Sequence, residues 1–418
     1  MITTSLTLVH TMYSTPRARA RAVSIWAGIG GLAIAAGPVL GGVLVEQSGW
    51  PSIFWVNVPI GTLSIAATLL LRFPPEPRRP RHLNLIGQLL FAAAVASLTY
   101  GLIQASTDGW AAGRVLASFV VAGVATLLFL WREWRCAEPM LPLASFRNRV
   151  MVFACAINFL MYYGLFGAMF LLTLYLQSVN RLSAVETGIR FLALSVTIAV
   201  GSLISPRLAQ RAGRGFARIS AAGTVAASLG LSGLLRLHAG SGYGTYWWAL
   251  VLLGLGIAFA MGPATIALPA SVQPDLLGRA AGVSQTFRQI GGVLGVALSG
   301  TLALQRLRHG LPTAFAGLDL PPSVRTHLFS TFSSGYLTVT GELPVSLRAV
   351  VASRVDPLLV DSMTVAFAVG ACVALTGVAP SATRRSAPRA ASAPRLPRPA
   401  CSPAACVPSM PAGGTSSS

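Results

Sequence analysis

The sequence predicts an all-α polytopic membrane protein with about ten spans and a partial helix before them. Hydrophobic residues make up 54% of the chain and charged residues only 10%, whereas a soluble domain has about 25% charged residues. The apolar residues gather in segments close to the length of roughly 20 residues that crosses a bilayer. Arginines are concentrated in alternate connections between these segments, which is typical of a polytopic membrane protein.

The apolar segments set the expected order of spans. Residues 1–13 are too short to cross a bilayer and lack the basic start of a signal peptide, so we interpret them as the last turns of a helix that begins earlier. The segment at 150–176 is long enough to tilt. The expected spans are 23–45, 53–71, 85–104, 115–131, 150–176, 188–208, 217–236, 245–270, 280–304 and 359–379.

The arginines predict the orientation of these spans. Positive residues favour the cytoplasmic side, and sixteen arginines lie in one set of alternate connections against four in the other set. With an even number of spans, both ends of the chain are expected in the cytoplasm. The first set is Arg17, Arg19, Arg21, Arg72, Arg78, Arg79, Arg81, Arg132, Arg135, Arg147, Arg149, Arg207, Arg211, Arg214, Arg218 and Arg279; the second is Arg114, Arg181, Arg190 and Arg236.

Two stretches stand apart from the spans. Residues 305–358 are expected to form a long external connection with a modestly amphipathic piece around Leu343 to Val351. Residues 381–418 are rich in Pro, Ala, Ser and Arg and have almost nothing to bury, so we expect a disordered tail.

The composition excludes several classes of function. The formal charge of +20 is spread over short loops rather than gathered on one face, so it does not indicate nucleic-acid binding. The five cysteines form no C-x-x-C pair, and no metal site or cofactor is expected. The histidines fall at or near span ends and no H-E-x-x-H occurs, so an intramembrane enzyme is not predicted.

The segment 28–44 has no charge and is rich in glycine, with Pro38 in its middle. In a bilayer small residues let helices approach closely, and proline removes one backbone hydrogen bond. Gly37, Pro38, Gly41 and Gly42 therefore predict a kinked helix with one bare face. The alternative is an ordinary packing face of small residues, and these residues alone do not distinguish the two.

The residues that follow this segment help to distinguish the two interpretations. After the glycines comes a turn with Trp50, Asn57, Pro59 and Gly61, together with Ile53, Phe54 and Ile60. The whole run resembles a signature of the major facilitator superfamily, in its fourteen-span drug:proton antiporter (multidrug efflux) branch: the motif G-x-x-x-G-P-x-x-G-G followed by G-W-R-x-I-F-x-x-N-x-P-I-G. Ala33 and Pro51 depart from that pattern, which has Gly and Arg at these positions.

A second match lies about two thirds of the way along the chain. Residues 278–292 include Arg288, Gln289, Gly291 and Gly292 and are similar to the motif that leads into the thirteenth helix of that family. The resemblance implies a gating or structural role for these four residues. The alternative for Arg288 is that its side chain extends to the cytoplasmic interface. Further matches cover 138–143, 146–149 and 170–177, and the final helix matches more weakly.

The resemblance implies major facilitator-like helix bundles and a division of the chain. In family terms the chain would be N-terminally truncated and hold helices five to fourteen. Asn84 and Gln210 stand where the family has Asp. The expected parts are 1–71, the remainder of the N-terminal bundle; 72–149, two linking spans with cytoplasmic loops; 150–380, the C-terminal bundle; and the tail, 381–418.

Proton coupling requires a carboxylate that titrates within the membrane. Glu46 and Asp361 lie nearest to spans, both at helix ends, where carboxylates are usually solvated anchors. Glu46 is the candidate, and the coupling residue stays unassigned.

Substrate contacts are expected from aromatic and amide side chains on the long 150–176 span, with packing or lipid contact as the alternative; the candidates are Asn158, Tyr162, Tyr163, Phe166 and Gln177.

The sequence thus predicts an exporter of drugs or other amphiphilic small molecules in a bacterial cytoplasmic membrane. It would exchange its substrate for protons by alternating access between two helix bundles. The alternative is a truncated, transport-inactive fragment or a membrane interaction partner, because incomplete bundles leave apolar and polar surfaces unpaired.

Overall fold

The computed structural model describes residues 16–70, 84–136, 146, 148–212, 215–272, 277–316 and 345–378. These residues form helices and the turns between them, without a strand. The expected partial helix at 1–13 and the tail at 381–418 lie outside them. The N-terminal helices are α2 (Pro16–Ser48), α3 (Ser52–Trp55) and α4 (Asn57–Leu70), followed by the pair α5 (Leu85–Asp108) and α6 (Gly113–Arg135).

The remaining helices follow in sequence order. They are α7 (Arg149–Leu174), continued by the π-turn η2 (Tyr175–Val179), then α8 (Ala184–Arg190), α9 (Leu192–Ala212), α10 (Phe216–Gly233), the 3₁₀ turn η4 (Leu234–Arg236), α11 (Tyr243–Ser271), α12 (Leu277–Ala314) and α14 (Val345–Thr376).

Nine helical segments among the described residues are long and apolar enough to cross a membrane. They coincide with nine of the ten expected spans, which confirms the all-α polytopic fold. The remaining expected span, 23–45, lies within α2, whose side chains are described only in part. The expected long span continues through η2 to Val179 and reaches 31 residues.

Two expected boundaries are wrong. The span predicted at 188–208 is divided, because α8 ends at Arg190 and α9 begins at Leu192. The external connection predicted at 305–358 is largely helical at both ends, since α12 continues to Ala314 and α14 begins at Val345. These extensions pack on each other through apolar residues, so helix pairing rather than hydropathy determines their length; the buried residues are Leu307, Leu311, Phe315, Val351 and Val355.

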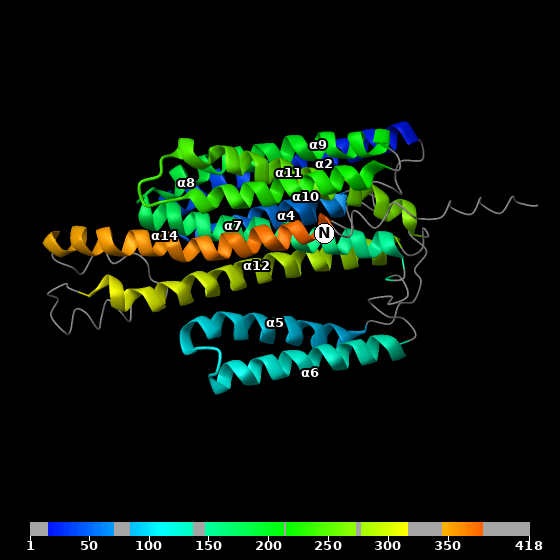
Figure 1. The fold of residues 1–418 in the computed structure, drawn as a ribbon. Helices are drawn as coiled ribbons and strands as arrows, with labels where there is room; N and C mark the ends of the chain where they lie inside the picture. The colour runs from blue at the N-terminus through cyan, green and yellow to red at the C-terminus, as the bar shows by residue number, and fades with distance from the viewer. Residues whose placement is uncertain are drawn as a thin grey trace, which may run out of the picture. The chain divides into compact units, whose positions relative to one another are not determined.

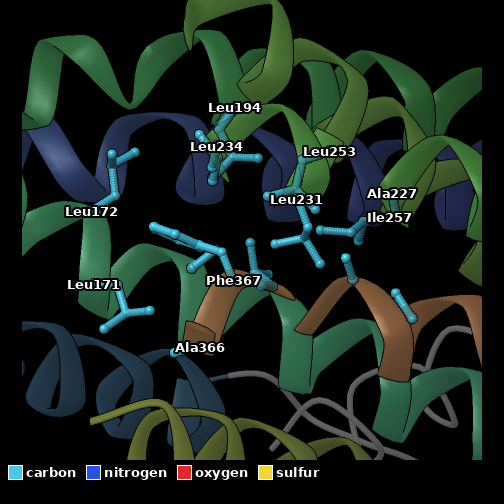
Figure 2. Packing of buried hydrophobic residues seen from close by; sticks show 14 of the residues in the cluster. Leu171, Leu172, Leu194, Ala227, Leu231, Leu234, Leu253, Ile257, Ala366 and Phe367 are labelled. Atoms are coloured by element: carbon cyan, nitrogen blue, oxygen red, sulfur yellow. The ribbon is translucent and has the colours of Figure 1, made fainter. Parts of the chain in front are cut away.

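The core lies among α7, α9, α10, α11 and α14. Figure 2 shows Leu171, Leu194, Leu231, Ile257 and Phe367 converging from these five helices. Leu171 is inaccessible and the other four side chains are at most 2% exposed. The α5–α6 pair lies next to α12, and α2 runs alongside α8 and α9 (Figure 1).

Glycine allows a close helix contact in this core, between α10 and α11. A Cβ atom added at Gly256 would lie 2.6 Å from the Ala227 Cα and 2.7 Å from the Gly223 carbonyl oxygen. Two buried hydroxyls add hydrogen bonds to neighbouring backbones: Ser220 donates to the Ala260 carbonyl and Ser228 to the Ala371 carbonyl, both at 2.8 Å. Close backbone packing and hydroxyl donors are the interactions that join helices in lipid.

We expect Gly256→Val to destabilise the chain by about 1–3 kcal/mol, because the new side chain would overlap backbone atoms of α10. The matched control is Gly123→Val on α6, where an added Cβ meets no heavy atom of the described residues within 4 Å. Thermal unfolding of the purified chain in detergent is the measurement. Equal melting temperatures for the two variants would contradict the close contact.

Candidate functional site

The glycine-rich part of α2 meets α8 at two glycines, one on each helix. A Cβ added at Gly42 would lie 2.8 Å from the carbonyl carbon of Ala184. A Cβ added at Gly188 would lie 2.9 Å from the carbonyl carbon of Pro38. Each glycine therefore admits the backbone of the other helix. An added Cβ at Gly37 or Gly41 meets no atom of the described residues within 4 Å, so Gly42 is the motif glycine at this contact and the backbone of Pro38 is its other motif residue.

Glu46 completes the contact between α2 and α8. The Val185 N–H donates to Glu46 Oε2 at 3.2 Å, in the first turn of α8. The first N–H groups of a helix have no intrahelical acceptor and attract negative charge. Ser183 and Glu186 form a capping box at the same end. Glu46 is therefore an exposed carboxylate that joins α2 to the start of α8.

The turn after α2 is held by local hydrogen bonds. Ser52 Oγ donates to the Leu44 carbonyl at 2.8 Å, and Asn57 Nδ2 donates to the Ile53 carbonyl at 3.0 Å. The Trp50 ring packs edge-on against Phe54 at 6.1 Å. Pro59 and Gly61 follow on α4, where no residue is buried. The predicted turn residues thus lie in the turn after α2 and in the first turns of α4.

The second motif packs α12 against α7. Added Cβ atoms at Gly291 and Gly295 would lie 3.0 Å and 2.9 Å from the Cα atoms of Phe159 and Tyr163. A Cβ at Gly292 would lie 3.2 Å from the ring of Phe166. Two of the predicted glycines, Gly291 and Gly292, therefore lie at one helix contact.

Polar and aromatic side chains follow the same contact. The buried Asn158 donates from Nδ2 to Ser284 Oγ at 2.8 Å. The Arg288 guanidinium lies over the Tyr162 ring, 4.3 Å from its centroid, which gives the cation an electrostatic partner inside the membrane. Arg288 thus contacts an aromatic ring on α7.

The five substrate candidates do not share one surface. Asn158 and Tyr163 are buried, Tyr162 is half-buried under Arg288, and Gln177 is exposed in the π-turn η2. Phe166 is 40% exposed and lines a cavity of about 830 Å³ between α5, α7, α12 and α14. Gln289 lines the same cavity, so the structure brings these two predicted residues together.

Sequence reasoning missed two carboxylates within spans. Glu133 on α6 is 2% exposed and accepts from Asn84 Nδ2 at 3.0 Å, and Arg132 Nε donates to Asn84 Oδ1 at 3.1 Å. The signal was present in the sequence, because Glu133 continues the helical spacing of a stripe formed by Val115, Ser118, Ala122, Ala125 and Phe129. Glu133 is therefore a buried carboxylate in the last turn of α6.

The second carboxylate is Asp356 on α14, 3.5 Å from the guanidinium of Arg181. Arg181 follows η2 and has a positive φ of 56°, a conformation uncommon for residues other than glycine. The sequence predicts external connections for both Arg181 and Asp356. Among the described residues no group of three or more His, Cys, Asp or Glu side chains could hold a metal ion.

Comparison with known proteins identifies the family. The profile described as Major Facilitator Superfamily matches residues 1–296. The chain belongs to the major facilitator superfamily. This is a family of membrane transporters, so the prediction that the chain is a multi-pass membrane protein and not an enzyme is confirmed.

Relatives within the superfamily are drug and antibiotic resistance proteins. The tetracenomycin C resistance and export protein of Streptomyces glaucescens is 33% identical over 384 residues, which are 91% of this chain and 71% of the relative. Multidrug resistance protein Stp of Mycobacterium tuberculosis is 34% identical over 305 residues, 72% of this chain and 55% of the relative. The methylenomycin A resistance protein of Bacillus subtilis is 35% identical over 306 residues, 71% of this chain and 64% of the relative. The chain thus spans about half to three quarters of these proteins.

We expect Glu133→Leu to destabilise the α5–α6 pair by about 1–3 kcal/mol, because the Asn84 amide loses this buried acceptor. Glu133→Gln is the matched control, since its amide oxygen still accepts a hydrogen bond. Thermal unfolding and the rate of proteolysis between α6 and α7 measure the effect. A leucine variant as stable as the glutamine variant would show that this hydrogen bond contributes nothing.

Proposed function

We propose that this chain exports drug-like amphiphilic molecules across a bacterial cytoplasmic membrane, in exchange for protons. The observation that carries the proposal is the contact of the glycine motif on α2 with α8, where Gly42 and Gly188 bring two backbones together. Alternating access requires helices that meet closely in one state and separate in the other. The names of the bacterial relatives, which include resistance and export proteins, support small-molecule export.

The arrangement of the bundles belongs to the same proposal. Residues 1–71 and 150–380 would contribute to the two bundles and residues 72–149 would link them. The arginine distribution supports cytoplasmic positions for both ends. The α2–α8 contact would then lie towards the external face, where its separation would release the substrate.

The decisive experiment is transport by the full chain in proteoliposomes with an imposed pH gradient and ethidium as the probe. We expect movement of ethidium that stops when nigericin collapses the gradient. Gly42→Val should lower the initial rate at least about tenfold, because a side chain there would overlap Ala184. Gly41→Val is the matched control and should keep most of the rate. Equal effects at both positions would contradict the role of the contact.

Glu46 allows a separate test of proton coupling. A proton carrier in alternating access must be reached from both faces, whereas Glu46 lies at one end of α2 and bonds to α8. We therefore expect Glu46→Gln, which keeps an oxygen acceptor, to transport with the pH dependence of the unaltered chain. Glu46→Ala should lower the rate by about twofold to fivefold, because the Val185 N–H at the start of α8 loses its acceptor. Loss of pH-driven transport in the glutamine variant would instead assign the coupling carboxylate to Glu46.

The alternative, a membrane interaction partner without transport activity of its own, is favoured by one observation. The segment Ser52–Leu70 has no buried residue and presents apolar side chains such as Leu63 and Leu69 on its surface. Exposed apolar surface of this extent fits lipid or another membrane helix. Proteoliposomes that contain folded chain but move no ethidium would support this alternative.

A further inference from the structure

One wall of the cavity of about 830 Å³ is formed by α5, a helix to which the proposed transport scheme assigns no role in binding. Thr99 and Ile103 of α5, one of the two linking helices, face α7, α12 and α14 across it. Hydrogen bonds hold this wall in place: Thr301 Oγ1 of α12 donates to the Leu102 carbonyl at 2.6 Å, and Gln305 Nε2 lies 3.5 Å from the Ala105 carbonyl. The cavity is thus a defined feature of the α5–α12 contact.

Small residues on α12 create the space. Gly292, Ala297, Gly300 and Ala303 lie along the cavity, and an added Cβ at Gly300 would lie 3.1 Å from the ring of Phe170. The volume falls within the range of roughly 300–1,000 Å³ that is typical of drug-sized ligand pockets. The cavity is therefore large enough for a molecule of that size.

Among the described residues the lining is largely apolar and carries no ionisable side chain; it includes Ile103, Phe170, Leu174, Val296, Leu304 and Met363. An ion brought into such a site would lose its hydration without a counter-charge, which is costly. The lining therefore selects against a charged group and favours an uncharged ligand.

Two polar side chains line the cavity, one on α5 and one on α12. The Thr99 hydroxyl oxygen is buried and has no hydrogen-bond partner among the described residues. Gln289 has an exposed side chain on the opposite helix, α12. Buried polar groups without a partner are rare in proteins. A ligand with a hydrogen-bonding oxygen would satisfy the Thr99 hydroxyl.

We propose that this cavity binds an uncharged, largely apolar small molecule with a hydrogen-bonding oxygen, and that α5 forms one wall of the site. The inference rests on the proposed function in one respect, because such a molecule would be an uncharged cargo of the exporter, bound at a different place from a cation such as ethidium. The linking pair α5–α6 is then part of the binding site and more than a connection between the bundles.

The test is equilibrium binding of Nile red, an uncharged lipophilic dye with a carbonyl oxygen, to the full chain in lipid nanodiscs. Ile103→Trp should weaken binding at least about tenfold by filling the cavity. Leu89→Trp is the matched control, since Leu89 is an exposed residue of the same helix outside the cavity, and it should bind as the unaltered chain does. Thr99→Val keeps the shape of the side chain and should weaken binding by roughly fivefold.

Three outcomes would overturn the proposal. The first is unchanged binding by Ile103→Trp. The second is displacement of Nile red by the lipophilic cation tetraphenylphosphonium as readily as by an uncharged competitor. The third is a phospholipid that native mass spectrometry finds bound to the chain and that Nile red does not displace.

The binding assay and the transport assay test the site and the export proposal independently. A chain that binds Nile red as expected yet moves no substrate would refute export and leave the site in place. A chain that exports, and whose Ile103→Trp variant binds and exports Nile red like the unaltered chain, would refute the site and leave export in place.

Discussion

The structure depends on close backbone contact between helices at small residues. In lipid, apolar side chains gain little by leaving the solvent, so helices associate through packing and a few hydrogen bonds. The same device recurs at three places: Gly256 against α10, Gly42 against α8, and Gly291 against α7. The first contact lies in the buried core, whereas the other two belong to motifs that the family resemblance connects with transport. One kind of contact thus serves both stability and the proposed movement.

Hydrogen bonds between specific polar residues of neighbouring helices add to this packing. The Asn158–Ser284 hydrogen bond fixes α7 on α12, and the Glu133–Asn84 hydrogen bond joins α6 to the start of α5. Each places a polar group where an unmatched partner would be costly. Arg288 is stabilised by a different kind of contact, because its guanidinium lies over the Tyr162 ring. Glycine contacts set how near the helices lie, and these polar contacts set their register.

The helix contacts differ in how much packed surface would be exposed if the helices separated. The core residues of α7, α10, α11 and α14 are almost wholly buried, and their separation would expose a large packed surface. Of the described residues of α2, in contrast, only Gly42 is buried, and the hydrogen bond between Glu46 and Val185 is exposed. This difference is consistent with a stable bundle that α2 contacts over a limited surface. The α5–α12 contact is also limited, and the cavity lies beside it.

The sequence by itself determined the helical membrane fold, nine of the spans and the family, because hydropathy and short motifs are local properties of the chain. The tertiary structure alone decided which motif glycine meets another helix, since Gly188 lies far from Gly42 in the chain. It also decided that Asn84 is the hydrogen-bond partner of Glu133, that α12 and α14 extend along each other, and that α5 closes one side of a cavity. Each depends on which distant surfaces face each other, and no local pattern contains that information.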